Sequence, residues 1–140
     1  VYTIMGDGEQ SEGSIWEAAA NAVRYQLGNL IAIVDFNGLE ADGTIDEITG
    51  LGDIAEKYRA FNWNVIEING NNVVEIKNSF DQLPEVNSDT PTVIIAHTIK
   101  GCGVPFMENQ VCWHAGKITE KQLDETVSLL KKQYKSRWDK

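Results

Sequence analysis

The sequence predicts an α/β fold with three layers, built on a mainly parallel sheet that carries helices on both faces. Short apolar runs, each ended by turn-forming residues, have the character of buried parallel strands and lie at residues 1–5, 30–36, 62–69 and 90–101. Segments with apolar residues at helical spacing lie between these runs, and such alternation is typical of a parallel sheet. A chain of 140 residues suits one domain, spanning residues 1–140.

The first expected strand, VYTIM, leads into the glycine-bearing turn GDGEQSEG. Ser14 and Glu17 have the spacing of a capping box, which predicts a helix over residues 15–27 that stops at Gly28. The apolar run LIAIVDF follows as the second strand, so the order of elements implies a parallel pair with a right-handed crossover. Because Val1 opens directly into a strand, we expect the N-terminal part of the fold to be missing and the chain to be a fragment of a longer one.

The middle of the chain continues this alternation. The polar segment at residues 38–50 predicts an extended loop with at most one helical turn, and residues 51–62 regain helical periodicity before the third strand. Asn72, with Glu75 three residues later, is expected to open the next helix.

The last strand, in TPTVIIAHTIKG, includes His97, which we expect to be a satisfied histidine of the core. A long glycine- and aromatic-containing loop follows at residues 101–116, and loops of that length usually serve function. Thr119 and Gln122 then have the spacing of a capping box and predict a final helix.

Composition and charge narrow the function classes. Hydrophobic residues make up 42% and charged residues 24% of the chain, the balance of a globular domain. A formal charge of −9 repels nucleic acid and anionic membrane surfaces, so we expect neither as a partner. An anionic cofactor would need a metal ion or clustered backbone N–H groups. Cys102 and Cys112 are expected to be reduced thiols, and no apolar run reaches the ~20 residues of a membrane span, which together favour a cytoplasmic protein.

Candidate ligands follow two neighbouring strands of the expected sheet. Asp7 lies between two glycines after the first strand, and Gly8 allows close approach of a ligand to the backbone. Asn37 ends the second strand, with the carbonyl of Leu39 two residues on. Because the carboxyl ends of parallel strands share one edge of the sheet, these oxygens are expected to converge there. Carboxylate, amide and carbonyl oxygens suit Mg²⁺ or Ca²⁺.

The motifs as a set resemble the transketolase family. GDGEQSEGSIWEAA is similar to the family's GDG-x-x-x-EG-x-x-x-EA, FNGLEADGTI to its DNG-x-x-x-DG-x-x, and TIKG and WHAG to its later loop, in the same order. The resemblance covers nearly the whole chain. It implies the thiamine diphosphate-binding fold, and within it the domain that binds the diphosphate.

The resemblance also implies site roles. It assigns Asp7, Asn37 and the Leu39 carbonyl to the divalent metal, and Gly8 to the cofactor's diphosphate.

Further roles implied by the resemblance fall on three other residues. His114, in WHAG, matches an active-site histidine near the cofactor and donor sugar, and Lys100 matches a position close to the cofactor. Glu12 matches one of two glutamates in an acidic catalytic network near the subunit interface.

The implied activity is a thiamine diphosphate- and metal-dependent transfer of a two-carbon ketol unit from a ketose phosphate to an aldose phosphate, as in the pentose phosphate pathway. Nothing in the chain resembles the family's pyrimidine-binding domain, so we expect that domain or subunit as a partner, in a dimer or heterotetramer. The chain thus resembles the small subunit of a split transketolase.

Two alternatives remain open at this point, and a third fits the sequence poorly. One is another thiamine diphosphate enzyme, such as deoxyxylulose phosphate synthase, which shares the GDG and TIKG features. A second is a non-catalytic interaction subunit that keeps the fold. A calcium-sensor loop beginning at Asp35 fits poorly, because Glu40 and Asp46 occupy the positions of its glycine and its closing glutamate.

Overall fold

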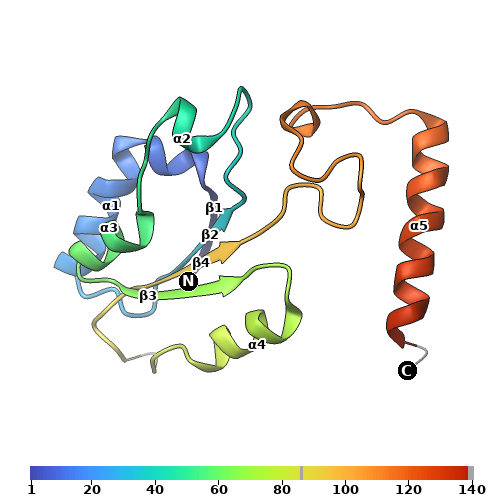
Figure 1. The fold of residues 1–140 in the computed structure, drawn as a ribbon. Coiled ribbons are helices and arrows are strands. Elements are labelled where there is room, and N and C mark those ends of the chain that lie inside the picture. Colours follow the sequence, from blue (N-terminus) through green and yellow to red (C-terminus); the bar gives the residue numbers. More distant parts are fainter. Residues whose placement is uncertain (86, 139–140) are drawn as a thin grey trace.

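The computed structural model, which describes residues 1–85 and 87–138, contains one parallel sheet of four strands (Figure 1). The strand order is β1-β2-β4-β3, and each neighbouring pair is parallel. The strands are β1 (Tyr2–Gly6), β2 (Ile31–Phe36), β3 (Asn64–Asn69) and β4 (Thr92–His97). The predicted α/β class and all four predicted strands are confirmed.

Helices flank the sheet on both faces. Side chains of α1 (Gly13–Arg24) and α3 (Ile54–Ala60) pack in one cluster with alternate residues of the central strands, among them Val34 and Val93. On the opposite face, α4 (Val73–Asp81) lies beside Ile66 and Ile68 of β3. This face is less completely covered, because Tyr2 and Ile4 of the edge strand β1 are 62% and 74% exposed. Helices therefore cover one face of the sheet fully and the other face only in part.

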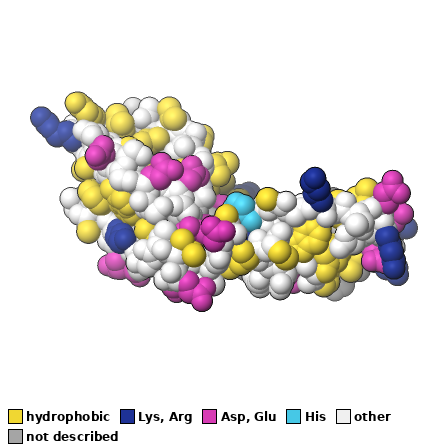
Figure 2. All heavy atoms as spheres, turned by 90° about the horizontal axis from the view of Figure 1, so that it is seen from above, with side chains coloured by type: hydrophobic (Ala, Val, Ile, Leu, Met, Phe, Trp, Pro, Cys, Tyr) yellow, Lys and Arg dark blue, Asp and Glu magenta, His cyan; other side chains and the backbone are white. Residues whose placement is uncertain are grey.

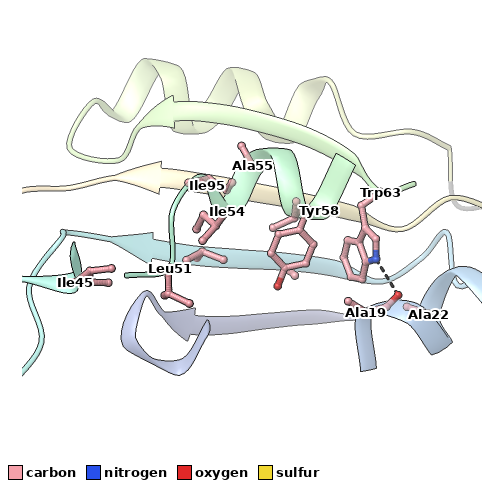
Figure 3. Packing of buried hydrophobic residues seen from close by; sticks show 12 residues of the cluster. Ala19, Ala22, Ile45, Leu51, Ile54, Ala55, Tyr58, Trp63 and Ile95 are labelled. Carbon is pink, nitrogen blue, oxygen red and sulfur yellow. Dashed lines mark hydrogen bonds between the residues drawn. The ribbon is translucent and has the colours of Figure 1, made fainter. Parts of the chain in front are cut away.

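Two aromatic residues, Tyr58 and Trp63, lie among aliphatic side chains in the closed core (Figure 3). The ring of Tyr58 lies 5.2 Å from that of Trp16 and 5.3 Å from that of Trp63, measured between centroids. The indole Nε1 of Trp63 donates to the backbone carbonyl of Ala19 at 3.0 Å, which joins α1 to the start of β3. Tilted and edge-on aromatic pairs of this kind stabilise a core beyond the area that they bury.

Local capping explains where most helices begin. Asn72 accepts hydrogen bonds from the N–H groups that open α4, and Thr119 and Gln122 form the predicted box before α5 (Glu120–Trp138). The helical turn α2 (Ile45–Ile48) has a full capping box from Thr44 and Glu47. Thus the expected single turn in the loop after β2 is present.

The predicted cap at Ser14 is wrong. The helix α1 begins at Gly13, two residues before the predicted start, with Glu12 in the N-cap position. A short 3-10 helix, η1 (Gly8–Ser11), precedes it, and Glu12, in an extended conformation, separates the two helices. Because the chain is already helical before Ser14, no free N-terminus remains there for its hydroxyl to cap.

His97 is not a core histidine, contrary to the expectation. It is the last residue of β4, and its side chain is 51% exposed. Its Nε2 lies 3.2 Å from Oε2 of Glu67 on the neighbouring strand, and its ring contacts Phe36 edge-on. The apolar run predicted a buried strand correctly, but burial ends where the strand reaches the edge of the sheet.

The last third of the chain leaves the sheet. A loop with the short 3-10 helix η2 (Val111–Trp113) follows β4, and α5 then stands apart from the layered body (Figure 1). The helix α5 contacts this loop near Gly103, where the side chain of Leu130 lies close to the backbone. None of the helices in the described part of the chain combines the length and apolarity needed to cross a bilayer.

Candidate functional site

A pocket of about 330 Å³ opens where β1, β2 and β4 end. The structure brings together in it all of the sequence-predicted site residues except Glu12. The lining consists of Gly6, Asp7, Gly8, Glu9, Asn37, Leu39, Glu40, Ala41, Lys100 and His114. Parallel strands with helical crossovers place their carboxyl ends at one edge of the sheet, which is why segments this far apart in the sequence meet.

Asp7 is the most buried carboxylate of the pocket, at 3% exposure. Its Oδ2 accepts hydrogen bonds from the N–H groups of Asn37 at 2.8 Å and Gly38 at 2.6 Å, and its Oδ1 accepts one from Gly8 at 2.9 Å. Gly38 has a φ of 76°, a left-handed conformation that glycine adopts without strain. Asp7 therefore joins the end of β1 to the end of β2.

These bonds leave room for a cation at Asp7. An ionised carboxylate accepts at about four positions, and three are used here, two of them on Oδ2. The remaining capacity is on Oδ1, in a residue that lines the pocket. The arrangement fits a carboxylate that is fixed by the backbone and binds metal through its less occupied oxygen.

Asn37 and Leu39 line the same pocket. Oδ1 of Asn37 accepts a hydrogen bond from the N–H of Leu39 at 3.2 Å, which holds the residues after β2 in a tight turn. Among the described residues, no three His, Cys, Asp or Glu side chains gather as a metal cluster. The predicted donors are instead mixed, one carboxylate, one amide and one carbonyl oxygen, and hard oxygens of these kinds suit Mg²⁺ or Ca²⁺.

Gly8 lines the pocket next to Glu40. A Cβ atom at position 8 would lie 3.3 Å from Cγ of Glu40, so a larger residue there would crowd the opening. Glu40 is held by a hydrogen bond of 3.1 Å from the hydroxyl of Thr49 to its Oε1. The absence of a side chain at position 8 thus keeps the backbone accessible to a ligand.

Lys100 and His114 reach the pocket from the loop after β4. Lys100 is half-buried, and its carbonyl accepts a hydrogen bond from the N–H of Asn109, which folds the loop back on itself. His114 is exposed and ends the short helix η2, where its N–H donates to the carbonyl of Val111. Both side chains can donate hydrogen bonds to anionic oxygens, Lys100 as an ammonium and His114 through a ring N–H.

Glu12 lies outside this pocket, unlike the other predicted site residues. It is exposed at the start of α1, and its side chain makes no capping hydrogen bond there. The carbonyl of Glu12 accepts from the N–H of Ile15, so the residue has a backbone role in this chain.

Two carboxylates in the pocket were missed by the sequence analysis, Glu9 and Glu40. Glu9 accepts a hydrogen bond of 2.6 Å from the N–H of Gly6, on the residue before Asp7. Glu40 follows Asn37 closely in the sequence, and this position was the only indication that it lies in the pocket. Sequence spacing alone does not distinguish a carboxylate in a pocket from one that faces solvent. With Asp7, these groups give the pocket three carboxylates against one lysine.

The charge of the pocket has a direct chemical consequence. An excess of carboxylates repels an anion such as a diphosphate, unless a cation of charge two or more lies between them. In Figure 2, acidic side chains lie beside a histidine at the junction between the body and the extended part of the molecule. The charge of the pocket therefore favours an anion that carries a metal ion over a free anion.

Comparison with known proteins gives a consistent result. The family described as "Transketolase, thiamine diphosphate binding domain" matches residues 1–137. The chain is 43% identical over 126 residues to an apulose-4-phosphate transketolase subunit of Phocaeicola vulgatus, covering 90% of this chain and 44% of that protein. It is 41% identical over 133 residues to the 6-deoxy-6-sulfo-D-fructose transketolase subunit SqwG of a Clostridium species, covering 95% of this chain and 48% of that protein.

Solved structures show the same fold. The transketolase of Campylobacter jejuni superimposes with a TM-score of 0.81 and 27% sequence identity, over 89% of this chain and 19% of that one. The chain thus spans less than half the length of the curated relatives and about a fifth of this larger enzyme.

Proposed function

This chain belongs to the transketolase family through its thiamine diphosphate-binding domain, and we propose that it supplies the metal and diphosphate half of a transketolase active site. In this proposal residues 1–140 form one diphosphate-binding domain. The observation that carries the proposal is the pocket at the strand ends, which contains Asp7, Asn37, Leu39, Lys100 and His114 together.

Each pocket residue has a defined task in this proposal. Asp7, Asn37 and the Leu39 carbonyl hold a divalent cation, Mg²⁺ or Ca²⁺, and Gly8 leaves room for the diphosphate beside it. Lys100 donates to an anionic oxygen of the cofactor.

His114 differs from these residues because it lies on the exposed side of the pocket. There it is placed to hydrogen-bond a group that changes charge during the reaction. Glu12, which the family resemblance placed in a catalytic network, has no such position within this chain and would act only through a neighbouring subunit.

When bound, thiamine diphosphate supplies the nucleophile for transfer of a two-carbon ketol unit from a ketose phosphate to an aldose phosphate. The chain's own residues bind, orient and exchange protons, and they do so only for the diphosphate end of the cofactor. The proposal therefore includes a pyrimidine-binding domain or subunit, in a dimer or heterotetramer. Relatives named as subunits of transketolases support this assignment.

Phosphorus NMR of thiamine diphosphate tests the half-site directly. Addition of the purified chain should broaden and shift the two phosphorus resonances in the presence of Mg²⁺ and leave them unchanged in excess chelator. Spectra that respond equally with and without Mg²⁺, or in neither case, would contradict the proposed metal and diphosphate site.

An activity measurement tests the second part of the proposal. The chain alone should transfer no ketol unit between sugar phosphates, and activity should appear with a pyrimidine-binding partner. Turnover at an ordinary enzymatic rate by the isolated chain would show that the half-site assignment is wrong. A complex that binds cofactor but never turns over would favour the alternative of a non-catalytic interaction subunit.

A further inference from the structure

A buried glutamine lies directly beneath the metal-binding turn. Gln10 is 0% exposed, although its amide is polar and its surroundings are largely apolar. An unpaired amide in such a place costs on the order of 1–3 kcal/mol. Both polar atoms of the Gln10 side chain have partners, so its burial is tolerated rather than strained.

Gln10 binds the backbone on both sides of Asp7. Its side-chain Nε2 donates to the carbonyl of Gly6 at 3.2 Å, and its backbone N–H donates to the carbonyl of Asp7 itself at 3.0 Å. The two peptide groups that set the direction of the Asp7 side chain are therefore both held by one residue. Its own carbonyl accepts from the indole Nε1 of Trp16 at 2.8 Å, which ties the same turn to α1.

Tyr58 of α3 determines which way the Gln10 amide points. Its hydroxyl donates to Oε1 of Gln10 at 2.9 Å, in a bond buried within the core. Burial raises the pKa of the Tyr58 phenol to about 12, so this hydroxyl keeps its proton and acts as the donor at any physiological pH. With Oε1 fixed as the acceptor, Nε2 must face the carbonyl of Gly6. Figure 3 shows the Tyr58 ring reaching from its helix across the sheet.

We propose that Gln10 and Tyr58 form a positioning pair that ties the turn carrying Asp7, the proposed metal ligand, to helix α3. Neither residue lines the pocket, so the pair acts through the backbone of the turn. An apolar side chain of similar size would fill the same volume, but it would leave the Gly6 carbonyl free to rotate and Asp7 less fixed. This inference rests on the proposed function only for the metal; the anchoring of the turn stands on the described contacts.

The test uses the full chain with the substitution Tyr58→Phe, which removes only the hydroxyl. Its control is Trp63→Phe, which removes the hydrogen bond from Nε1 to Ala19 and alters the packing beside the Tyr58 ring, but keeps the Tyr58 hydroxyl and its bond to Gln10. The first measurement is amide hydrogen exchange at Asn37 and Gly38, whose N–H groups donate to Oδ2 of Asp7. Exchange at these two sites should accelerate in Tyr58→Phe and remain at the parent rate in Trp63→Phe, after correction for global stability.

The second measurement is the affinity for thiamine diphosphate at limiting Mg²⁺. Tyr58→Phe should weaken it roughly three- to tenfold, the change expected for one lost hydrogen bond, and Trp63→Phe should leave it within about twofold of the parent. The apolar substitution Gln10→Met should weaken it at least as much, and adding Tyr58→Phe to that variant should cause no further loss.

Each outcome bears on one of the two proposals. Unchanged exchange at Asn37 and Gly38 in Tyr58→Phe, or equal acceleration in Trp63→Phe, would overturn the positioning role. Independent, additive effects of the two substitutions would overturn the pairing. If the parent chain itself shows no Mg²⁺-dependent binding, the proposed function fails, and the exchange measurement still decides whether Gln10 and Tyr58 anchor the turn.

Discussion

The pocket is built from two regions that are held in different ways. The turn after β1 is anchored by buried hydrogen bonds. Asp7 is bonded to the residue after β2, and Gln10 is bonded to side chains of α1 and α3. The loop after β4 carries Lys100 and His114, and most of its hydrogen bonds are made within the loop. Its ties to the sheet region come at its start, where Thr98 donates to Phe36 and Ile99 to the side chain of Asn71.

We expect this difference in support to separate the residues that bind the cofactor from those that act during turnover. Under the proposed function, Asp7 must be in position before the cation arrives, and its contacts with the core would hold it there. His114 would contact the substrate as it reacts, a role that suits its exposed position on the loop after β4. We therefore expect substitutions in the turn to affect binding and stability together, and substitutions in the loop to affect turnover or binding alone.

The largest effect is expected for Asp7→Ala. Loss of a charged ligand should weaken Mg²⁺-dependent binding of thiamine diphosphate by about 3 kcal/mol, or roughly a hundredfold, as measured by calorimetry. The free energy of unfolding should also fall, by about 2 kcal/mol, because the N–H groups of Asn37 and Gly38 lose their acceptor. Asp7→Asn keeps an acceptor oxygen and should recover part of the stability without the binding.

The matched control is Asp53→Ala. Asp53 accepts from the N–H of Glu56 as the N-cap of α3, outside the pocket. Its loss should lower the free energy of unfolding by about 1 kcal/mol and leave cofactor affinity at the parent value. A similar loss of affinity in both variants would mean that binding tracks stability, and the special role of Asp7 would be refuted.

A smaller effect, confined to turnover, is expected for His114→Ala. In the reconstituted enzyme the turnover number should fall roughly ten- to a hundredfold, because a lost contact to a reacting group is worth about 1.5–3 kcal/mol. Cofactor affinity and the free energy of unfolding should stay near their parent values. His97→Ala, which removes the other histidine of the chain, provides the control, and turnover of His114→Ala within twofold of the parent would make His114 an ordinary loop residue.

The smallest effect is expected for Lys100→Met, which removes a charge but keeps the length of the side chain. A half-exposed ion pair contributes about 1 kcal/mol, so affinity for thiamine diphosphate should fall roughly fivefold at low salt. The loss should shrink as ionic strength rises. Lys117→Met, on the same loop but outside the pocket lining, should change affinity little; a salt-independent loss, or an equal one in both variants, would exclude direct contact with the anion.

Local sequence patterns predicted the strands and helices well, because burial of apolar runs and capping by nearby side chains determine where these elements form. Apolar runs ended by turn residues located all four strands, and side-chain oxygens at Asn72 and Thr119 located the starts of two helices. The prediction at Ser14 failed although its pattern was real, because the extended residue Glu12 already serves as the N-cap and Ser14 lies within the first turn of α1. Boundaries between adjacent helical segments depend on both segments together.

The site was predictable only as far as strand ends define it. Asp7 and Asn37 were predicted to lie together because residues that follow parallel strands meet at one edge of the sheet, and both line the pocket. Glu12 was assigned to the site by resemblance alone, and within this chain it faces solvent. The role of Gln10 could not be found, because it depends on a hydroxyl 48 residues away in the sequence. Contacts at that distance follow from packing and not from spacing.

The bonds that Asp7 makes to Asn37 and Gly38 have a consequence for how such chains diverge. A descendant that no longer needed its cofactor would still be selected to keep this carboxylate, since losing it would remove two hydrogen bonds that join the end of β1 to the turn after β2. In the described contacts, the side chain of His114 bonds to no other element of the fold. Substitutions at this position would therefore accumulate once selection for turnover ended. Among related sequences, the histidine of the WHAG motif is thus a better guide to retained activity than the aspartate of the GDG motif.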